Sequence, residues 1–471
     1  MLLTVAAAGG DHATLKSALA AAEPGARIVL APGLYEGDLR IGKPVTVVGD
    51  GPRDAVVLSG SVTVIADAEL RNLTIADARG HSLSLRGQID PRVVDCVIRD
   101  GAQIGVYVTG GARGRFERCD VRGHGWSNVE VRDAGSAPEL CHCRIVDGKR
   151  GGVYVHSSAQ GRFVDCAVAG HALANVFIQS RAEPTFLRCR VHDGKEGGLM
   201  ALDGGGGALE ACELWSNALS GVELRDGATT TLWGCVIRNG RGNGLFVHDD
   251  ARGQLTDCTI MGNGRSGVLI QASGAPSLEG CVIEGNRDSG VVIDRGGGGT
   301  LSDCTIRDHA RAAIEVRDGS DPLLQRCQLD GASAAGIECD DGGKGRFEDC
   351  RVARVAVAGV AVGKGGAPVL VRCSVEAALV GLSVALSGAV TVEDCRVVGA
   401  DVAAVCVRDQ GTIGLSRSTV RGGRFGIFID GQGGGIVEQC VVSGRERAWV
   451  RGGRGELVES GNVEQSGPVA A

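Results

Sequence analysis

Aromatic residues are scarce in this chain of 471 residues: phenylalanine, tyrosine and tryptophan together make up 3% of it. So few large apolar side chains argue against a conventional globular core. No apolar run reaches the length of a membrane-spanning helix, and the sequence has no Walker A loop, HExxH zinc motif or nucleophile elbow. The sequence therefore predicts no membrane span and lacks the usual signatures of nucleotide, zinc-protease and serine-hydrolase chemistry.

An excess of positive charge is also absent. With 49 Lys+Arg against 56 Asp+Glu, the formal net charge is −7, so we expect neither a nucleic acid nor a membrane as partner. The first residues, MLLTVAAAGGD, carry no basic segment and reach Asp11 early, which predicts no secretory signal and a cytoplasmic location. No motif calls for a cofactor, and the sequence does not define an oligomeric state.

Glycine and cysteine are abundant, with 77 and 18 copies, and the cysteines are periodic. Each repeat has a short apolar strand around its cysteine and a second alternating strand beginning about nine residues later, such as Gly152 to Val155. Such units bury no core alone and must stack. The pattern predicts an all-β fold, a single right-handed parallel β-helix (solenoid) of about 16–18 coils with 23-residue rungs. The periodic cysteines are residues 96, 119, 143, 166, 189, 212, 235, 258, 281, 304, 327, 350, 373, 395 and 440, and Ser418 takes one place.

The periodic cysteines share one side of their strand, so they are predicted to form a buried ladder of reduced thiols. Stacked disulfides and zinc are the alternatives. Disulfides are disfavoured in a cytosolic protein, and zinc sites need converging ligands, so no metal is expected. Cys141 and Cys406 fall on the opposite, outward side.

The two ends of a β-helix need covers, because its last strands have unpaired edges. Near the start, Leu15, Ala18, Leu19 and Ala22 form the apolar stripe of a predicted capping helix that Pro24-Gly25 ends. We predict three segments: residues 1–69 form the cap helix and first coils, residues 70–455 the regular rungs, and residues 456–471 the last rung and a frayed tail.

Three motifs, APxLxxC, IxDGKxGGVYV and GRFxDC, resemble the carbohydrate-binding-and-sugar-hydrolase (CASH) repeats of F-box-only ubiquitin-ligase substrate receptors and their bacterial relatives. The opening TLKSALAAAEPGARIVLAPGLYEG resembles the cap of the pectin-lyase-like superfamily. The resemblance implies a right-handed β-helix that binds protein or glycan. Cysteine stands where those repeats usually carry asparagine, and no F-box precedes the helix, so ubiquitin-ligase membership is not implied.

Side chains that flank the inward residues of the second strand are predicted to face outward, and several are aromatic or charged. We interpret this stripe as a binding face, the alternative being that strands simply favour aromatic residues. Other outward pairs, such as Glu315/Arg317 and Glu338/Asp340, continue the column. The predicted binding residues are Tyr107, Glu130, Arg132, Tyr154, His156, Phe177, Glu223, Arg225, Phe246 and His248.

The main functional hypothesis is a non-catalytic recognition scaffold that binds a protein or peptide, rather than a polysaccharide, along this stripe. The alternative is an enzyme: a carbohydrate-active lyase, hydrolase or epimerase of the pectin-lyase type, or an enzyme of a small metabolite. In the enzyme hypothesis, Asp203, Asp226 and Asp249 at the strand edge, with His248, are the catalytic candidates, because carboxylates one rung apart suit glycoside chemistry. The same aspartates are also ordinary turn residues.

Overall fold

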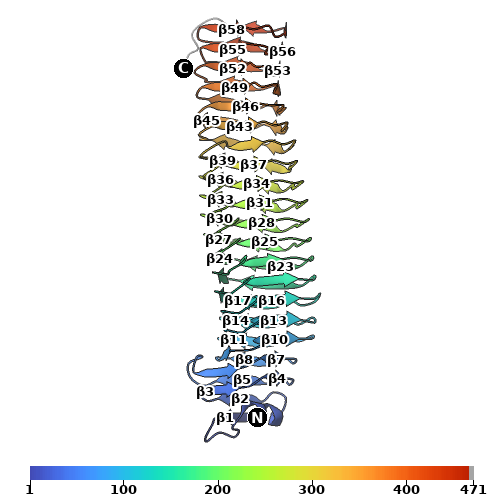
Figure 1. The fold of residues 1–471 in the computed structure, drawn as a ribbon, viewed down its shortest axis with the longest axis vertical. Helices are drawn as coiled ribbons and strands as arrows, with labels where there is room; N and C mark the ends of the chain where they lie inside the picture. Colours follow the sequence, from blue (N-terminus) through green and yellow to red (C-terminus); the bar gives the residue numbers. More distant parts are fainter. Residues whose placement is uncertain (466–471) are drawn as a thin grey trace. The chain divides into compact units, whose positions relative to one another are not determined.

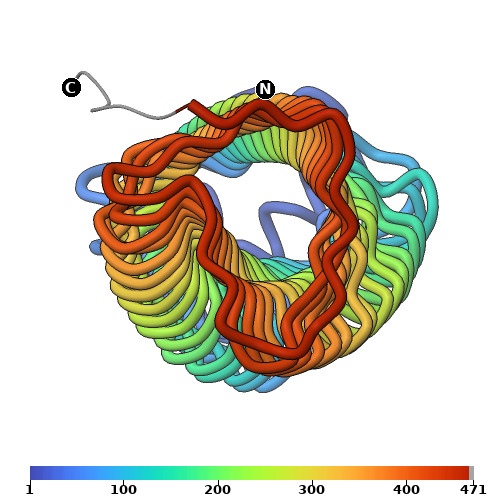
Figure 2. Tube along the Cα trace, turned by 90° about the horizontal axis from the view of Figure 1, so that it is seen from above, coloured from blue at the N-terminus to red at the C-terminus, as the bar shows by residue number. Residues whose placement is uncertain are grey.

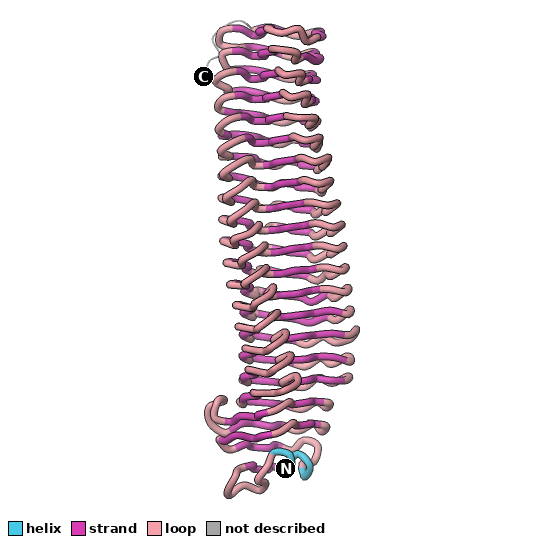
Figure 3. The backbone as a smooth tube through the Cα atoms, in the orientation of Figure 1, coloured by secondary structure: helices cyan, strands magenta, loops and turns pink. Residues whose placement is uncertain are grey.

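The computed structural model describes residues 1–465 and is almost entirely β, with one short helix, α1 (Leu15–Ala21) (Figure 3). It divides into two units, which are described separately: unit 1 holds residues 1–223 and 227–236, and unit 2 holds residues 224–226 and those from 237 onward. Within each unit, coil follows coil in chain order (Figure 1). No helix among the described residues is long and apolar enough to cross a membrane.

Each coil contains three short strands, one in each of three parallel sheets. In unit 1, for example, one coil holds β11 (Arg92–Val94), β12 (Val97–Arg99) and β13 (Val106–Thr109). Each strand pairs in parallel with its equivalent in the next coil, so that Val93 lies beside Phe116. Seen along the stacking direction, successive coils of a unit follow the same closed path (Figure 2). The predicted parallel β-helix is confirmed.

The chain has about 20 coils, more than the 16–18 expected. The difference arises because the first coils, before Cys96, stack without a ladder cysteine and were not recognised by the cysteine period. The sequence predicts one strand around each cysteine, but the structure has two, one before the cysteine and one after it. The residue before the cysteine bends the chain with a positive φ, 55° at Asp95 and 51° at Arg118, a conformation that aspartate tolerates better than most residues.

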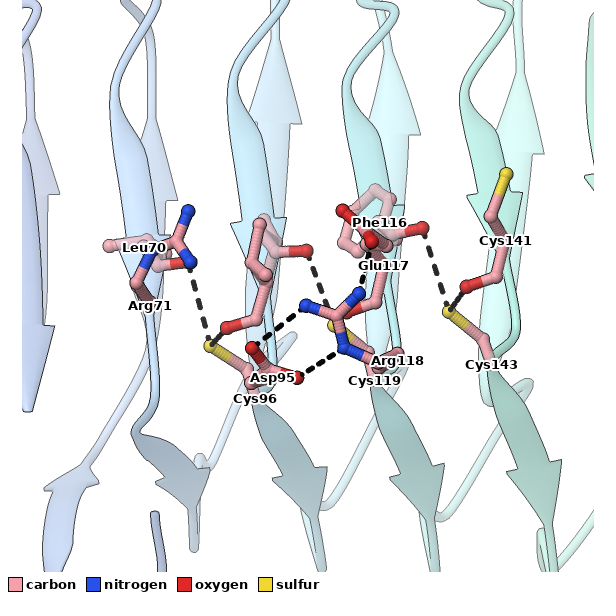
Figure 4. A network of polar contacts seen from close by, with 12 residues as sticks. Leu70, Arg71, Asp95, Cys96, Phe116, Glu117, Arg118, Cys119, Cys141 and Cys143 are labelled. Carbon is pink, nitrogen blue, oxygen red and sulfur yellow. Dashed lines mark hydrogen bonds and ion pairs between the residues drawn. The ribbon is translucent and has the colours of Figure 1, made fainter. Parts of the chain in front are cut away.

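The ladder cysteines lie in the core of each unit, as predicted. Every cysteine in the described chain is a free thiol, and all but Cys141 are buried. Figure 4 shows the pattern in unit 1: Cys96 Sγ donates to Leu70 O at 3.7 Å, and Cys143 Sγ donates to Phe116 O at 3.7 Å. Each thiol therefore has a partner in the preceding coil, and burial raises the pKa of Cys96.

Thiol labelling should follow this burial. In the native protein we expect fast alkylation at Cys141 alone, because its side chain is partly exposed, whereas Cys406, predicted to face outward, is only 8% exposed. Burial raises the pKa of both thiols, so neither is an activated nucleophile. Mass spectrometry after alkylation with and without guanidinium measures this, and fast native labelling of Cys143 would contradict it.

A second buried ladder in unit 1 consists of polar side chains five and nine residues after a ladder cysteine. His124 Nδ1 donates to Asn128 Oδ1 at 3.0 Å, Asn128 Nδ2 donates to His171 Nε2 at 3.1 Å, and His171 Nδ1 donates to Asn175 Oδ1 at 2.7 Å. Each bond uses a neutral ring with its proton on Nδ1. Glycine makes room: a Cβ at Gly148 would lie 2.7 Å from His171 Cδ2.

Helix α1 covers the first coil, as predicted. It packs on β1 (Leu2–Val5) and β2 (Arg27–Leu30), with Leu15 and Ala18 buried. Lys43 closes its C-terminal end by donating from Nζ to Ala22 O at 2.7 Å. At the other end of the chain, the tail predicted to fray lies, from residue 466 onward, outside the described residues.

Candidate active site

In unit 1 the residues of the predicted stripe lie side by side on one sheet. Strands β13, β16 (Val129–Arg132), β19 (Val153–His156) and β22 (Val176–Ile178) stack in register. Tyr107 therefore lies beside Glu130, Glu130 beside Tyr154, and Tyr154 beside Phe177, as the alternation of side chains predicts.

The polar atoms of this column are engaged with one another. The Tyr154 ring stacks on His156 with centroids 4.3 Å apart and meets Phe177 edge-on at 6.3 Å. His156 uses Nε2 toward Glu130 Oε1 at 3.3 Å and Nδ1 toward Ser157 Oγ at 2.9 Å. Because both ring nitrogens are occupied, His156 is poorly placed to act as a base. Burial raises the pKa of Tyr154, and the charge of Glu130 adds to this.

The remaining predicted residues of unit 1 are Arg132 and Asp203, at or just after strand ends, and Glu223, within a strand. Arg132 Nε donates to Asp133 Oδ1 at 3.2 Å, and this contact raises the pKa of Arg132. Asp203 is exposed just after β25 (Leu199–Ala201) and accepts from Ser180 Oγ at 2.9 Å. Glu223 is half-buried in β28 (Val222–Leu224).

In unit 2 the predicted residues bind their own sequence neighbours. Arg225 Nε lies 3.5 Å from Asp226 Oδ2, and His248 Nδ1 lies 2.7 Å from Asp249 Oδ2. The His248 ring also stacks on Phe246 of β31 (Leu245–Val247) at 4.1 Å. Both aspartates are exposed and have positive φ, 51° and 48°. This is the geometry of turn residues. Each carboxylate is paired with a basic side chain beside it in the sequence, and not with the second carboxyl group that glycoside chemistry requires.

Two glutamates on successive rungs of unit 2 form a more distinctive arrangement. Glu315 lies in β40 (Ile314–Val316) and Glu338 in β43 (Ala335–Cys339), and the register places them side by side. Adjacent strands are separated by about 4.8 Å. The two carboxyl groups therefore project from one face at about the spacing of their strands.

Three donor groups surround the carboxyl group of Glu315. Its side chain is only 7% exposed. Arg317 Nη1 donates to Glu315 Oε1 at 2.6 Å, Ser289 Oγ donates to Glu315 Oε2 at 3.0 Å, and Arg311 Nη2 lies 4.0 Å from Oε1. Two guanidinium groups and a hydroxyl thus stabilise one buried negative charge.

The environment of Glu338 favours its protonated form. Burial raises the pKa of its carboxyl group, and the charge of Glu315 raises it further, against the lowering effect of Arg311. Among the residues described here, Arg317 donates a hydrogen bond to Glu315, but no arginine donates one to Glu338. Neighbouring carboxyl groups with opposed environments are typical of an acid paired with a nucleophile or base.

A third carboxylate, Asp294, completes the cluster. It follows β37 (Val291–Ile293), its side chain is 6% exposed, and its Oδ2 accepts from Arg317 Nη2 at 3.2 Å. Arg317 therefore bridges Asp294 and Glu315. The other oxygen, Asp294 Oδ1, is buried without a hydrogen-bond partner. In the part of the chain that the structure describes, no group of three or more histidine, cysteine, aspartate or glutamate side chains is arranged to hold a metal ion.

The sequence contained a signal for this pair that the strand-edge aspartates obscured. In the outward column that runs from Tyr107 through Glu130 to Glu338, residues 315 and 338 are the first two successive rungs to carry a carboxylate at the same position. What the sequence could not indicate is which donors surround Glu315 and how far burial raises the pKa of Glu338.

The comparisons with known proteins agree with this fold. The sequence profile of the family described as the right-handed β-helix region matches residues 48–174, 142–264 and 249–397. No curated protein matches the chain.

Three solved structures illustrate the likeness. Pectate lyase Pel9A has 13% identity over 50% of this chain and 75% of its own, with a TM-score of 0.44. The periplasmic alginate epimerase AlgG has 13% identity over 66% and 77%, with a TM-score of 0.40. The A-module of the mannuronan C-5 epimerase AlgE4 of Azotobacter vinelandii has 15% identity over 82% and 92%, with a TM-score of 0.31. At such identities the likeness is one of fold.

These findings contradict the hypothesis of a non-catalytic scaffold whose partner is a protein or peptide. The three solved structures named above are enzymes named for polysaccharides, a lyase and two epimerases. The alternative hypothesis, a carbohydrate-active enzyme, agrees better with them. The expected preference for a protein partner over a polysaccharide is wrong for the same reason.

Proposed function

Because the chain belongs to the right-handed β-helix family, which sets equivalent side chains of successive rungs side by side, we propose that it is a carbohydrate-active enzyme, a retaining glycoside hydrolase. The observation that carries this proposal is the Glu315–Glu338 pair, two carboxyl groups on adjacent strands with opposed environments. Retaining glycosidases use two carboxyl groups about 5 to 5.5 Å apart, which is close to the spacing of paired strands.

The environments assign the roles. Glu338, whose pKa is raised by burial, is the general acid: its carboxyl proton goes to the glycosidic oxygen as the bond to the anomeric carbon breaks. Glu315, held by hydrogen bonds from Arg317 and Ser289, is the nucleophile, and its carboxylate forms an ester with the anomeric carbon. In the second step Glu338, now a carboxylate, takes a proton from water, and the hydroxide displaces Glu315 from the sugar.

Arg317 is a positioning residue in this scheme. Its guanidinium donates to Glu315 and Asp294 at 2.6 and 3.2 Å, which holds the nucleophile in one orientation and prevents it from taking the proton of Glu338. Ser289 holds the second oxygen of Glu315. The aromatic column of unit 1 and the aspartates 203, 226 and 249 have no role in this reaction scheme.

The stereochemical course tests the proposal. The protein is incubated with hexamers of glucose, N-acetylglucosamine, glucosamine and galacturonate, and the first-formed anomer is followed by proton NMR. We expect hydrolysis of at least one hexamer with retained configuration, because two carboxyl groups at strand spacing leave no room for a water opposite the leaving group. Inverted product, an unsaturated lyase product, or no turnover of any hexamer would refute this assignment.

A further inference from the structure

We propose that the glycan bound at the Glu315–Glu338 site carries amino groups, so that its sugar units are cationic hexosamines; this rests on the hydrolase function proposed above. The negative charge at the site is unusually concentrated. The carboxyl groups of Asp294, Glu315 and Glu338 lie on three successive rungs. Two more, Asp318 and Asp340, act electrostatically on Arg317 and Glu338.

The site has too few positive charges to balance these carboxyl groups. Among the described residues, Arg311 and Arg317 are the cations that interact with the glutamate pair, and Arg311 is shared with Asp288 at 3.5 Å. At the same strand-to-turn edge, Lys364 is paired with Asp341 at 3.0 Å, and Arg295 directly follows Asp294 in the chain. The five carboxyl groups thus outnumber the three arginines at the site, Arg295, Arg311 and Arg317, and the surface remains negative even when Glu338 is protonated.

Asp294 supplies an independent indication of a ligand. Its side chain is more than nine-tenths buried within the cluster, yet Oδ1 accepts no hydrogen bond. A buried carboxylate oxygen without a donor is costly, because it has lost its hydration and gained no hydrogen bond in return. Arg317, which covers Asp294, is 38% exposed, so its long side chain can shift to admit a donor.

The chemistry of the missing donor follows from the charge. An ammonium group donates three hydrogen bonds and accepts none, so it satisfies the Asp294 oxygen and reduces the charge excess at once. A sugar hydroxyl would satisfy the oxygen alone. A uronate would bring another carboxylate next to five, and like charges at such distances repel. A polymer of amino sugars is therefore favoured over neutral glycans and far over polyuronates.

Binding of defined oligosaccharides to the full chain tests this substrate class. Isothermal titration at low salt and about pH 6, where an amine of this kind is protonated, compares the hexamers of glucosamine, N-acetylglucosamine and galacturonate. We expect the glucosamine hexamer to bind at least tenfold more tightly than its neutral acetylated counterpart, and the galacturonate hexamer not to bind. In Asp294→Asn the preference for the cationic hexamer should fall at least tenfold.

Asp303→Asn is the matched control, because it removes the same charge from the same unit at a carboxylate that is paired with Arg326 at 2.7 Å, away from the cluster. It should leave the preference unchanged. Equal affinity for the neutral and cationic hexamers, binding of the galacturonate hexamer, or no binding at all would overturn the inference. Selective binding without turnover would refute the hydrolase alone, whereas hydrolysis of a neutral hexamer without cationic preference would refute the substrate class alone.

Discussion

Replacing Glu338 by glutamine is expected to lower kcat by about 10²- to 10⁴-fold, the usual contribution of a general acid. Glutamine has the same shape but no proton to give to the glycosidic oxygen. KM should change little, because the side chain is only half-buried and its amide can still contact substrate. Initial rates of reducing-end release from the hexamer that the wild-type protein hydrolyses fastest measure the effect.

The pH profile gives the same residue a second readout. Glu338 acts while protonated, so activity is lost as the pH rises through its pKa. Since burial and the charge of Glu315 raise that pKa, the alkaline limb of kcat/KM should lie above the ordinary range of glutamate. Glu279→Gln, an exposed glutamate on another sheet of unit 2, is the control and should keep both rate and profile. A Glu338→Gln variant with wild-type kcat would exclude the assigned role.

The fold was largely predictable because one residue type, cysteine, recurs with the period of the coils. A cysteine every 23 residues, with apolar neighbours on both sides, places one face inward, and the parity of each strand then follows. This reasoning placed Tyr154 beside Phe177 correctly. It did not find the third strand of each coil, because the bend depends on a single residue such as Asp95 whose positive φ is not encoded by an apolar pattern.

The candidate site was less predictable for an electrostatic reason. Asp226 and Asp249 looked like a catalytic column, yet each is paired with its own neighbour at a turn. Glu315 and Glu338 looked like ordinary outward residues. Their roles depend on Arg317, two residues from Glu315, and on burial that only the packed coils create. Sequence spacing predicts which side chains are neighbours, but it does not predict which of them are protonated.

The buried histidines of unit 1 should make the protein sensitive to acid. Burial lowers the pKa of both His124 and His171 to about 4 from an ordinary value of 6.5, and their bonds to asparagine offset this only in part. Below about pH 6.5 the unfolded chain therefore binds protons that the folded chain does not bind. The free energy of unfolding is unaffected by these rings above that pH and falls as the pH drops toward 4. Each histidine ring should lower the free energy of unfolding by roughly 3 kcal/mol as the pH falls from 6.5 to 4.

The double change His124→Asn and His171→Asn should remove most of this acid sensitivity while keeping the fold at neutral pH. Asparagine already occupies the equivalent place at Asn217, where it is buried and hydrogen-bonded to Asn175. Denaturant midpoints followed by circular dichroism from about pH 7 to 4 measure the effect. His142→Asn, an exposed histidine with a left-handed backbone that asparagine tolerates, should retain the wild-type slope. If the double variant loses stability with acid as steeply as the wild-type protein, the uptake of protons by these two rings is not what destabilises the coils, and the carboxylates of the surface ion pairs, such as Asp95 with Arg118, become the cause to test.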